Sequence, residues 1–150
     1  EYARTVNDSY NFSIPKDFLK WDPSIHQFGK AYFTPNNPEN DKKELTGFYT
    51  LVDAFLKSDS LSLLDVWGHS WENDGEGNRW VEMENFFKLV AKNKDIYYTT
   101  QIHLVDYINA YRNLKFSVDK TIIENHSTFD VYIKVENKSH KISAGSIIKI

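Results

Sequence analysis

The sequence predicts an α/β fold followed by a small antiparallel β extension. Helical and strand-like apolar patterns alternate up to residue 113, and short β-type runs separated by turn residues follow from 114 to 150. Hydrophobic residues make up 41% of the chain and charged residues 26%, which is typical of a folded protein. The 150 residues are enough for one ordinary domain or for part of a larger one.

The first half of the chain predicts one loop region, one helix and one strand. Residues 1–40 contain all 4 prolines and little periodicity, so we expect a loop there, with one short helical turn from Pro15. Between Glu44 and Lys57, apolar residues recur at helical spacing and predict a helix. The apolar run from Leu61 to Trp67 is short, which favours a buried strand.

The second half predicts two further helices, one strand and the β extension. Asn78 is a suitable N-cap for a helix whose apolar face carries Trp80, Met83, Phe87 and Val90. Residues 95–100 are typical of a short strand, and a third helix is expected to end near Asn113. This alternation of helices and strands implies a parallel sheet built from αβ units. The β-type runs after residue 114 predict an antiparallel extension.

Composition excludes several classes of protein. The net charge is -3 and no basic run exceeds two residues, so the chain lacks the basic patch of a nucleic-acid-binding protein. The absence of cysteine excludes disulfides, iron–sulfur sites and thiol nucleophiles. No apolar run approaches the ~18 residues that a membrane span needs. The chain starts without methionine, so we expect it to be a piece of a longer protein.

His69 is the strongest candidate for a chemical role. It follows the expected buried strand, and functional residues gather at such strand ends in α/β sheets and barrels. Imidazole titrates near neutral pH, so it can both donate and accept a proton. The alternative is a solvated loop histidine, or one that only caps the barrel.

The neighbours of His69 have two interpretations. Trp67 and Trp71 flank it and suit a platform for sugar rings, although a core tryptophan is the alternative. The acids Glu72, Asp74 and Glu76 follow; they could tune the histidine, but a hydrated acidic turn is favoured.

Asp65, Arg4 and His26 are weaker candidates. Asp65 alternates with Trp67 along the expected strand, so it is either a site carboxylate or a satisfied structural one. Arg4 could hold a carboxylate or simply be exposed, and His26 lies in the long loop, which could bring it to a pocket. The histidines are too scattered to indicate a set of metal ligands, so we expect zinc binding no tighter than millimolar, with His26 and His69 as first candidates for any site.

From residue 64 to 72 the chain reads Leu-Asp-Val-Trp-Gly-His-Ser-Trp-Glu, which resembles the last active-site motif of the polysaccharide deacetylases, the NodB-homology or carbohydrate esterase 4 family. Residues 80–90 and 95–111 are similar to the helix, strand and closing helix of bacterial members. Residues 3–6 and 17–21 resemble the family's middle motifs. The resemblance covers residues 1–113, and residues 114–150 resemble a C-terminal extension of some bacterial members.

This resemblance implies the C-terminal portion of a distorted (β/α) barrel that hydrolyses N-acetyl groups of amino-sugar polymers with a divalent metal, usually zinc. It implies that His69 is the general acid, that Arg4 orients the carboxylate base and that Trp21 helps wall the substrate pocket. Trp67 and Trp71 complete the candidate substrate-binding residues. An acetylated polysaccharide or oligosaccharide is the expected substrate, and the cell envelope or the extracellular space is the expected location.

The chain departs from the family in two ways. The family's Asp-Asp pair and His-x-x-x-His pair, which supply the base and the metal ligands, are absent. We therefore expect zinc only in the full-length domain, no metal ligands in this chain, and self-association of the incomplete barrel. Lys20 stands where the family has an aspartate that orients the histidine, so that carboxylate could be Asp17, Asp22 or neither. A non-catalytic carbohydrate-binding or structural module is the alternative function.

Overall fold

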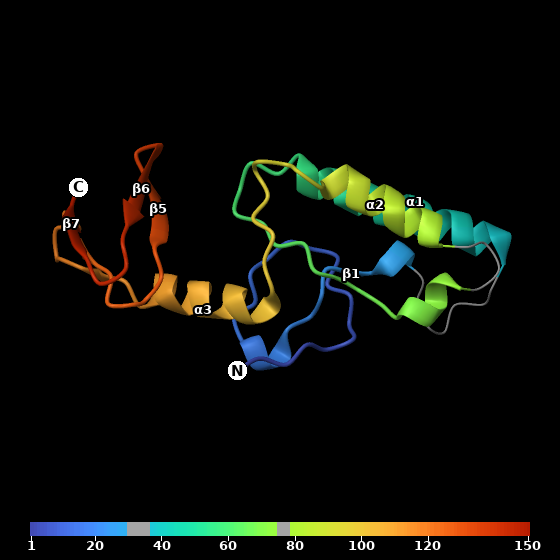
Figure 1. The fold of residues 1–150 in the computed structure, drawn as a ribbon, viewed down its shortest axis with the longest axis horizontal. Coiled ribbons are helices and arrows are strands. Elements are labelled where there is room, and N and C mark those ends of the chain that lie inside the picture. Colours follow the sequence, from blue (N-terminus) through green and yellow to red (C-terminus); the bar gives the residue numbers. More distant parts are fainter. Residues whose placement is uncertain (30–36, 75–78) are drawn as a thin grey trace. The chain divides into compact units, whose positions relative to one another are not determined.

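The computed structural model describes residues 1–29, 37–74 and 79–150. The chain has mixed α/β structure and divides into two compact units, residues 2–97 and residues 98–150 (Figure 1). In these described ranges no sheet closes into a barrel. The mixed α/β class is therefore confirmed, whereas the origin of the fold in a larger barrel stays a prediction.

Helix α1 (Pro38–Leu56) begins earlier than the apolar spacing predicts. Asn37 is its N-cap and accepts a hydrogen bond from the backbone N–H of Asn40, and Pro38 takes the first helical position. The expected start at Glu44 came from apolar residues alone. Those residues begin only where the helix reaches the core, whereas the capping residues lie upstream.

Helix α2 (Trp80–Val90) packs beside α1 through aromatic side chains. The ring centroids of Phe48 and Phe86 lie 5.3 Å apart, and α1 and α2 lie side by side in Figure 1. The predicted apolar face is wrong by one residue, because Phe86 is 7% exposed while Phe87 is 58% exposed. Spacing alone cannot decide which of two adjacent phenylalanines faces the core. The expected N-cap Asn78 lies outside the described residues.

The core of the N-terminal unit joins both helices to the extended segments. Its buried members are Ile25, Phe28, Phe48, Val52 and Phe86. Burial of large apolar side chains is the main source of stability in a unit of this size. This core fixes the positions of the segments that carry the candidate site.

Parallel pairing is present in the N-terminal unit over short stretches. Strand β1 (Ile25–His26) pairs in parallel with β2 (Val66–Trp67), and Arg4 forms a parallel bridge with Trp21. The expected parallel sheet of αβ units is not present in the described residues, because the partner of β2 is β1, which lies in the segment predicted to be a loop. The buried strand expected over residues 61–67 is wrong in extent, because only Val66 and Trp67 form a strand. The residues before them bond to a loop instead: the backbone N–H of Leu63 donates to the carbonyl oxygen of Phe12. Strand β2 is also only half-buried.

Among the described residues of this unit, three short 3-10 turns remain: η1 (Phe18–Lys20), η2 (Gln27–Gly29) and η3 (Ser70–Asn73). Asp17 caps η1 by accepting a hydrogen bond from the backbone N–H of Leu19, which confirms a helical turn after Pro15. The η3 turn follows β2 closely and shapes the candidate site.

The C-terminal unit contains helix α3 and two small antiparallel sheets. Its elements are α3 (Gln101–Arg112), β3 (Lys115–Phe116), β4 (Ile122–Glu124), β5 (Val131–Val135), β6 (Lys138–Ile142) and β7 (Ile147–Lys149). The strand order is β3-β4-β7 in one sheet and β5-β6 in the other. Glu136 and Asn137 both have positive φ, as a two-residue hairpin turn between β5 and β6 requires. The predicted antiparallel extension is therefore confirmed.

Helix α3 belongs to the core of this C-terminal unit. Its residue Ala110 and the following Leu114 pack with Ile123, Val131 and Ile142, all nearly or fully buried. The compact unit thus starts before α3, whereas the expected division lay after residue 113. The strand expected over residues 95–100 is wrong, because this segment is irregular and has no strand partner among the described residues.

Candidate active site

His69 is held at the end of β2 by the turn that follows it. The η3 turn brings Glu72 back toward His69, three residues earlier. One carboxylate oxygen of Glu72, Oε2, accepts a hydrogen bond from the backbone N–H of His69 at 2.9 Å. The other oxygen, Oε1, lies 3.1 Å from Nδ1 of the His69 ring. A single carboxylate therefore fixes both the backbone and the side chain of His69.

His26 approaches the same carboxylate from strand β1. The parallel register places His26 beside Trp67, at the strand end from which His69 follows. Nε2 of His26 lies 3.1 Å from Glu72 Oε1 and 3.1 Å from Oε2. His26 is only 2% exposed. We call His26, His69 and Glu72 the histidine–glutamate cluster.

Gln27 completes the support of the cluster. Its Nε2 donates hydrogen bonds of 2.7 Å to Glu72 Oε2 and of 2.7 Å to the carbonyl oxygen of His69. A Cβ at Gly68 would lie 2.3 Å from Cδ of Gln27, so the Gln27 side chain would have to move. A larger residue at position 68 would therefore displace the amide that holds Glu72.

The hydrogen bonds keep Glu72 ionised. Burial by itself raises the pKa of this carboxyl, but the hydrogen bonds from the backbone and ring of His69, the nearby His26 and the amide of Gln27 outweigh it and hold the pKa below its ordinary value of 4.5. An ionised carboxylate accepts hydrogen bonds and cannot donate them. The nitrogen atoms that face it, Nδ1 of His69 and Nε2 of His26, are therefore the protonated ones.

Replacement of Glu72 should destabilise the N-terminal unit in a pH-dependent way. A pKa that is lower in the folded state stabilises the fold above pH 4.5, and this contribution is lost as the pH falls through the folded-state pKa. We expect Glu72→Gln to have a lower free energy of unfolding than the unsubstituted chain at pH 7, and we expect this difference to become smaller toward pH 3. Tryptophan fluorescence during urea unfolding measures this, since all 4 tryptophans lie in this unit. A difference in free energy of unfolding that stays constant with pH would show that the charge of Glu72 contributes nothing to stability.

Aromatic and cationic side chains surround the cluster. The rings of His69 and Trp71 stack, with centroids 5.2 Å apart, and the rings of Trp67 and His26 meet edge to face, with centroids 4.7 Å apart. The guanidinium of Arg4 lies 4.7 Å from the centre of the Trp67 ring, a cation–π contact. Trp67 also donates from Nε1 to Asp8 at 2.7 Å. Arg4, Trp67, His69 and Trp71 are thus brought together, as expected for one site.

Trp21 and Arg4 are placed differently from what their suggested roles require. Trp21 is 1% exposed, so its ring presents no surface to a ligand in this arrangement. Arg4 donates to the carbonyl oxygen of Thr5 and covers Trp67, and within the described residues it pairs with no carboxylate.

The carboxylate beside His69 is neither of the two considered upstream. Asp17 caps η1, and Asp22 accepts a hydrogen bond from the hydroxyl of Thr5. Glu72 takes this place, so the interpretation of a merely hydrated acidic turn is wrong for this residue. Asp74 accepts a hydrogen bond from the Trp80 indole at 2.7 Å, and Glu76 lies outside the described residues.

Sequence reasoning missed the grouping of His26, Gln27 and Glu72. His26 and Glu72 are 46 residues apart, so only the parallel register of β1 and β2 brings them together. A signal for Glu72 was present, because a glutamate three residues after a cap position commonly reaches back to the cap N–H. His26 carried no comparable signal, because the residues directly before it, Pro23-Ser24-Ile25, form no apolar run.

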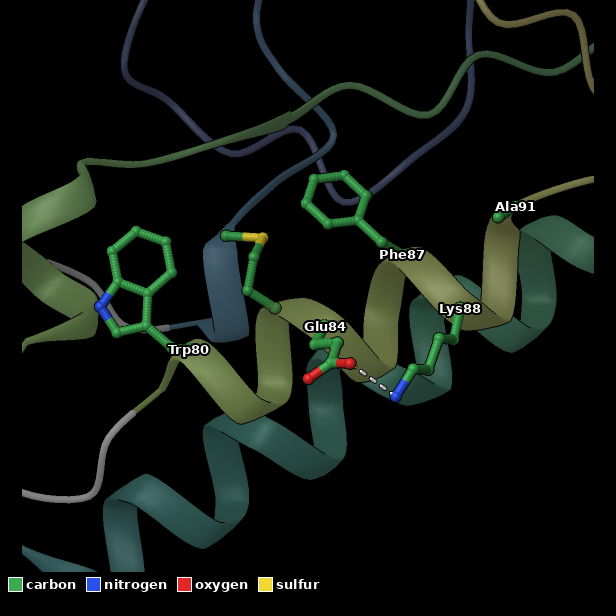
Figure 2. A pocket seen from close by; sticks show the side chains of 6 residues that line it. Trp80, Glu84, Phe87, Lys88 and Ala91 are labelled. Carbon is green, nitrogen blue, oxygen red and sulfur yellow. Dashed lines mark ion pairs between the residues drawn. The ribbon is translucent and has the colours of Figure 1, made fainter.

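A second surface feature lies on α2, away from the cluster in sequence. A hollow of about 430 Å³ is lined by Trp80, Met83, Glu84, Phe87, Lys88 and Ala91. Trp80 and Phe87 project from the helix (Figure 2). The Glu84–Lys88 ion pair of 2.7 Å spans one helical turn at the margin of the hollow.

No family model, no curated protein and no solved structure matches this chain. Among the described helices, none combines the length and the apolarity needed to cross a membrane. The geometry of the cluster and the resemblance of the motifs around it therefore carry the functional argument.

Proposed function

We propose that this chain is the C-terminal part of a polysaccharide deacetylase and that His69 is the residue that protonates the leaving amine. The observation that carries the proposal is the hydrogen bond of His69 Nδ1 with Glu72. It fixes the ring and leaves Nε2 as the nitrogen that can transfer a proton. The side chain of His69 is 48% exposed while that of Glu72 is 10% exposed, so a polymeric substrate can reach the ring while Glu72 stays largely covered.

The chemistry of amide cleavage needs such a residue. Departure of an amine from a tetrahedral intermediate requires a proton on nitrogen, because the unprotonated amide ion is a very poor leaving group. A doubly protonated His69 gives the Nε2 proton to this nitrogen as the C–N bond breaks, and Glu72 stabilises the positive ring beforehand. Trp71, stacked on His69 and 56% exposed, offers an apolar face to a sugar ring.

The resemblance implies a divalent metal that activates water when it is bound. The motifs that hold this metal in the family, an Asp-Asp pair and a His-x-x-x-His pair, do not occur in this sequence. This chain therefore does not fit that metal by itself, and the base and the metal belong to a longer parent protein. An envelope or extracellular location goes with a polymeric substrate of this kind.

A non-catalytic carbohydrate-binding function is the second candidate, favoured by the exposed indole of Trp71. Acetate release from an N-acetylated amino-sugar oligomer, measured on the parent protein, separates the two. We expect acetate and free amine to form in equal amounts. Binding of the oligomer without acetate release would exclude the deacetylase and support the binding function.

A further inference from the structure

The histidine–glutamate cluster has the donors and spacing of a transition-metal site, and we propose that this chain binds one Zn²⁺ ion through His26 Nε2, His69 Nδ1 and the carboxylate of Glu72. The three donor atoms lie within 4.8 Å of one another. Two imidazoles and one carboxylate are the protein ligands of a familiar class of zinc sites. The sequence predicted only weak zinc binding, because His26 and Glu72 are 46 residues apart along the chain and their spacing gave no sign of a ligand set.

The spacing suits zinc with little rearrangement. Ligands at 2.0–2.1 Å in a tetrahedral site lie about 3.4 Å from each other. The two histidine nitrogens are each 3.1 Å from Glu72 Oε1, so a slight outward movement of the rings opens room for the ion. The half-exposed His69 leaves one side open for entry and for a water ligand.

The surroundings prepare the carboxylate for this role. Gln27 and the backbone N–H of His69 both donate to Oε2 of Glu72 and hold the carboxylate in place. Hydrogen bonds to a ligating carboxylate orient it and typically strengthen metal binding. Nδ1 of His26 has no hydrogen-bond partner within the described residues, so no contact at Nδ1 opposes the tautomer that carries its proton there and leaves Nε2 bare for the ion.

Zinc binding and proton transfer by His69 exclude each other. An imidazole bound to zinc through Nδ1 cannot become the doubly protonated ring that donates a proton. Zinc at this site would therefore inhibit the reaction proposed above; this consequence alone rests on the proposed function. The binding itself is a property of the chain and is tested without any assay of activity.

Calorimetric titration of the metal-free 150-residue chain with zinc chloride tests the proposal. We expect one equivalent to bind with a Kd of about 1 µM or tighter, corresponding to about 8 kcal/mol. Glu72→Gln and His69→Gln should each weaken binding at least about tenfold. His126→Gln is the matched control, because His126 forms a comparable pair with Glu124 at 2.9 Å but has no third ligand in the described part of the chain.

Tryptophan fluorescence before titration shows whether each variant is folded. Because the His69 side chain is half-exposed, we expect His69→Gln to stay folded even if Glu72→Gln destabilises the N-terminal unit, so zinc binding can still be compared in that variant. Saturation only at millimolar zinc would overturn the proposal. Equal affinity in the parent chain and His69→Gln would overturn it too, as would a loss of binding in His126→Gln.

Discussion

His69→Ala in the parent protein should lower the rate of deacetylation by about 10²–10⁴-fold, the usual contribution of a positioned general acid. This corresponds to about 3–5 kcal/mol of the activation barrier. The reason is that the amine leaves only when it is protonated, and the half-exposed ring held by Glu72 is the donor that the site offers. Acetate release per folded molecule, measured at saturating oligomer, gives the effect on kcat.

The matched control is His126→Ala, which removes an exposed histidine that also pairs with a glutamate, Glu124. It should leave the rate unchanged. Retention of a third or more of the turnover in folded His69→Ala would remove His69 from the mechanism. If His69 only capped the turn, the variant would instead lose stability and keep its rate per folded molecule.

Phe48→Ala should destabilise the N-terminal unit by about 3–5 kcal/mol. Phe48 is 0% exposed, and its ring contacts Phe28 at 5.1 Å and Phe86 at 5.3 Å between centroids. Removal of the ring leaves a cavity between α1, α2 and the segment that carries His26. Urea unfolding followed by tryptophan fluorescence measures the loss in this unit.

Leu61→Ala is the control for this substitution. Leu61 lies in the same unit and is also a large apolar residue, but it is 78% exposed. Its truncation should change stability by no more than about 0.5 kcal/mol. A similar loss in both variants would show that the core is not centred on Phe48.

The sequence predicted the helices well because their signals are local. Apolar residues at helical spacing indicated α1, α2 and α3, and turn residues indicated the hairpin of β5 and β6. The strands of the first half were predicted less well. Residues 95–100 have strand-like composition, but a strand exists only where a partner supplies hydrogen bonds, and pattern reasoning does not show the partner.

The candidate site was predicted in part for the same reason. His69 and its flanking tryptophans are close in sequence, and their grouping follows from one loop. The contact of His26 with Glu72 depends on the parallel register between β1 and β2, a long-range fact. The burial of Trp21 likewise depends on packing that its position along the chain does not reveal.

Ionised Glu72 holds the His69 ring through Nδ1, so the decisive observation is which nitrogen of that ring carries the proton. Nitrogen-15 NMR of the histidine rings at neutral pH distinguishes the two forms of a neutral imidazole. We expect that in the metal-free 150-residue chain the neutral ring of His69 carries its proton on Nδ1, and that Glu72→Gln abolishes this preference. A His69 ring with its proton on Nε2 and a bare Nδ1 in the unsubstituted chain would show that Glu72 does not hold the ring in this way.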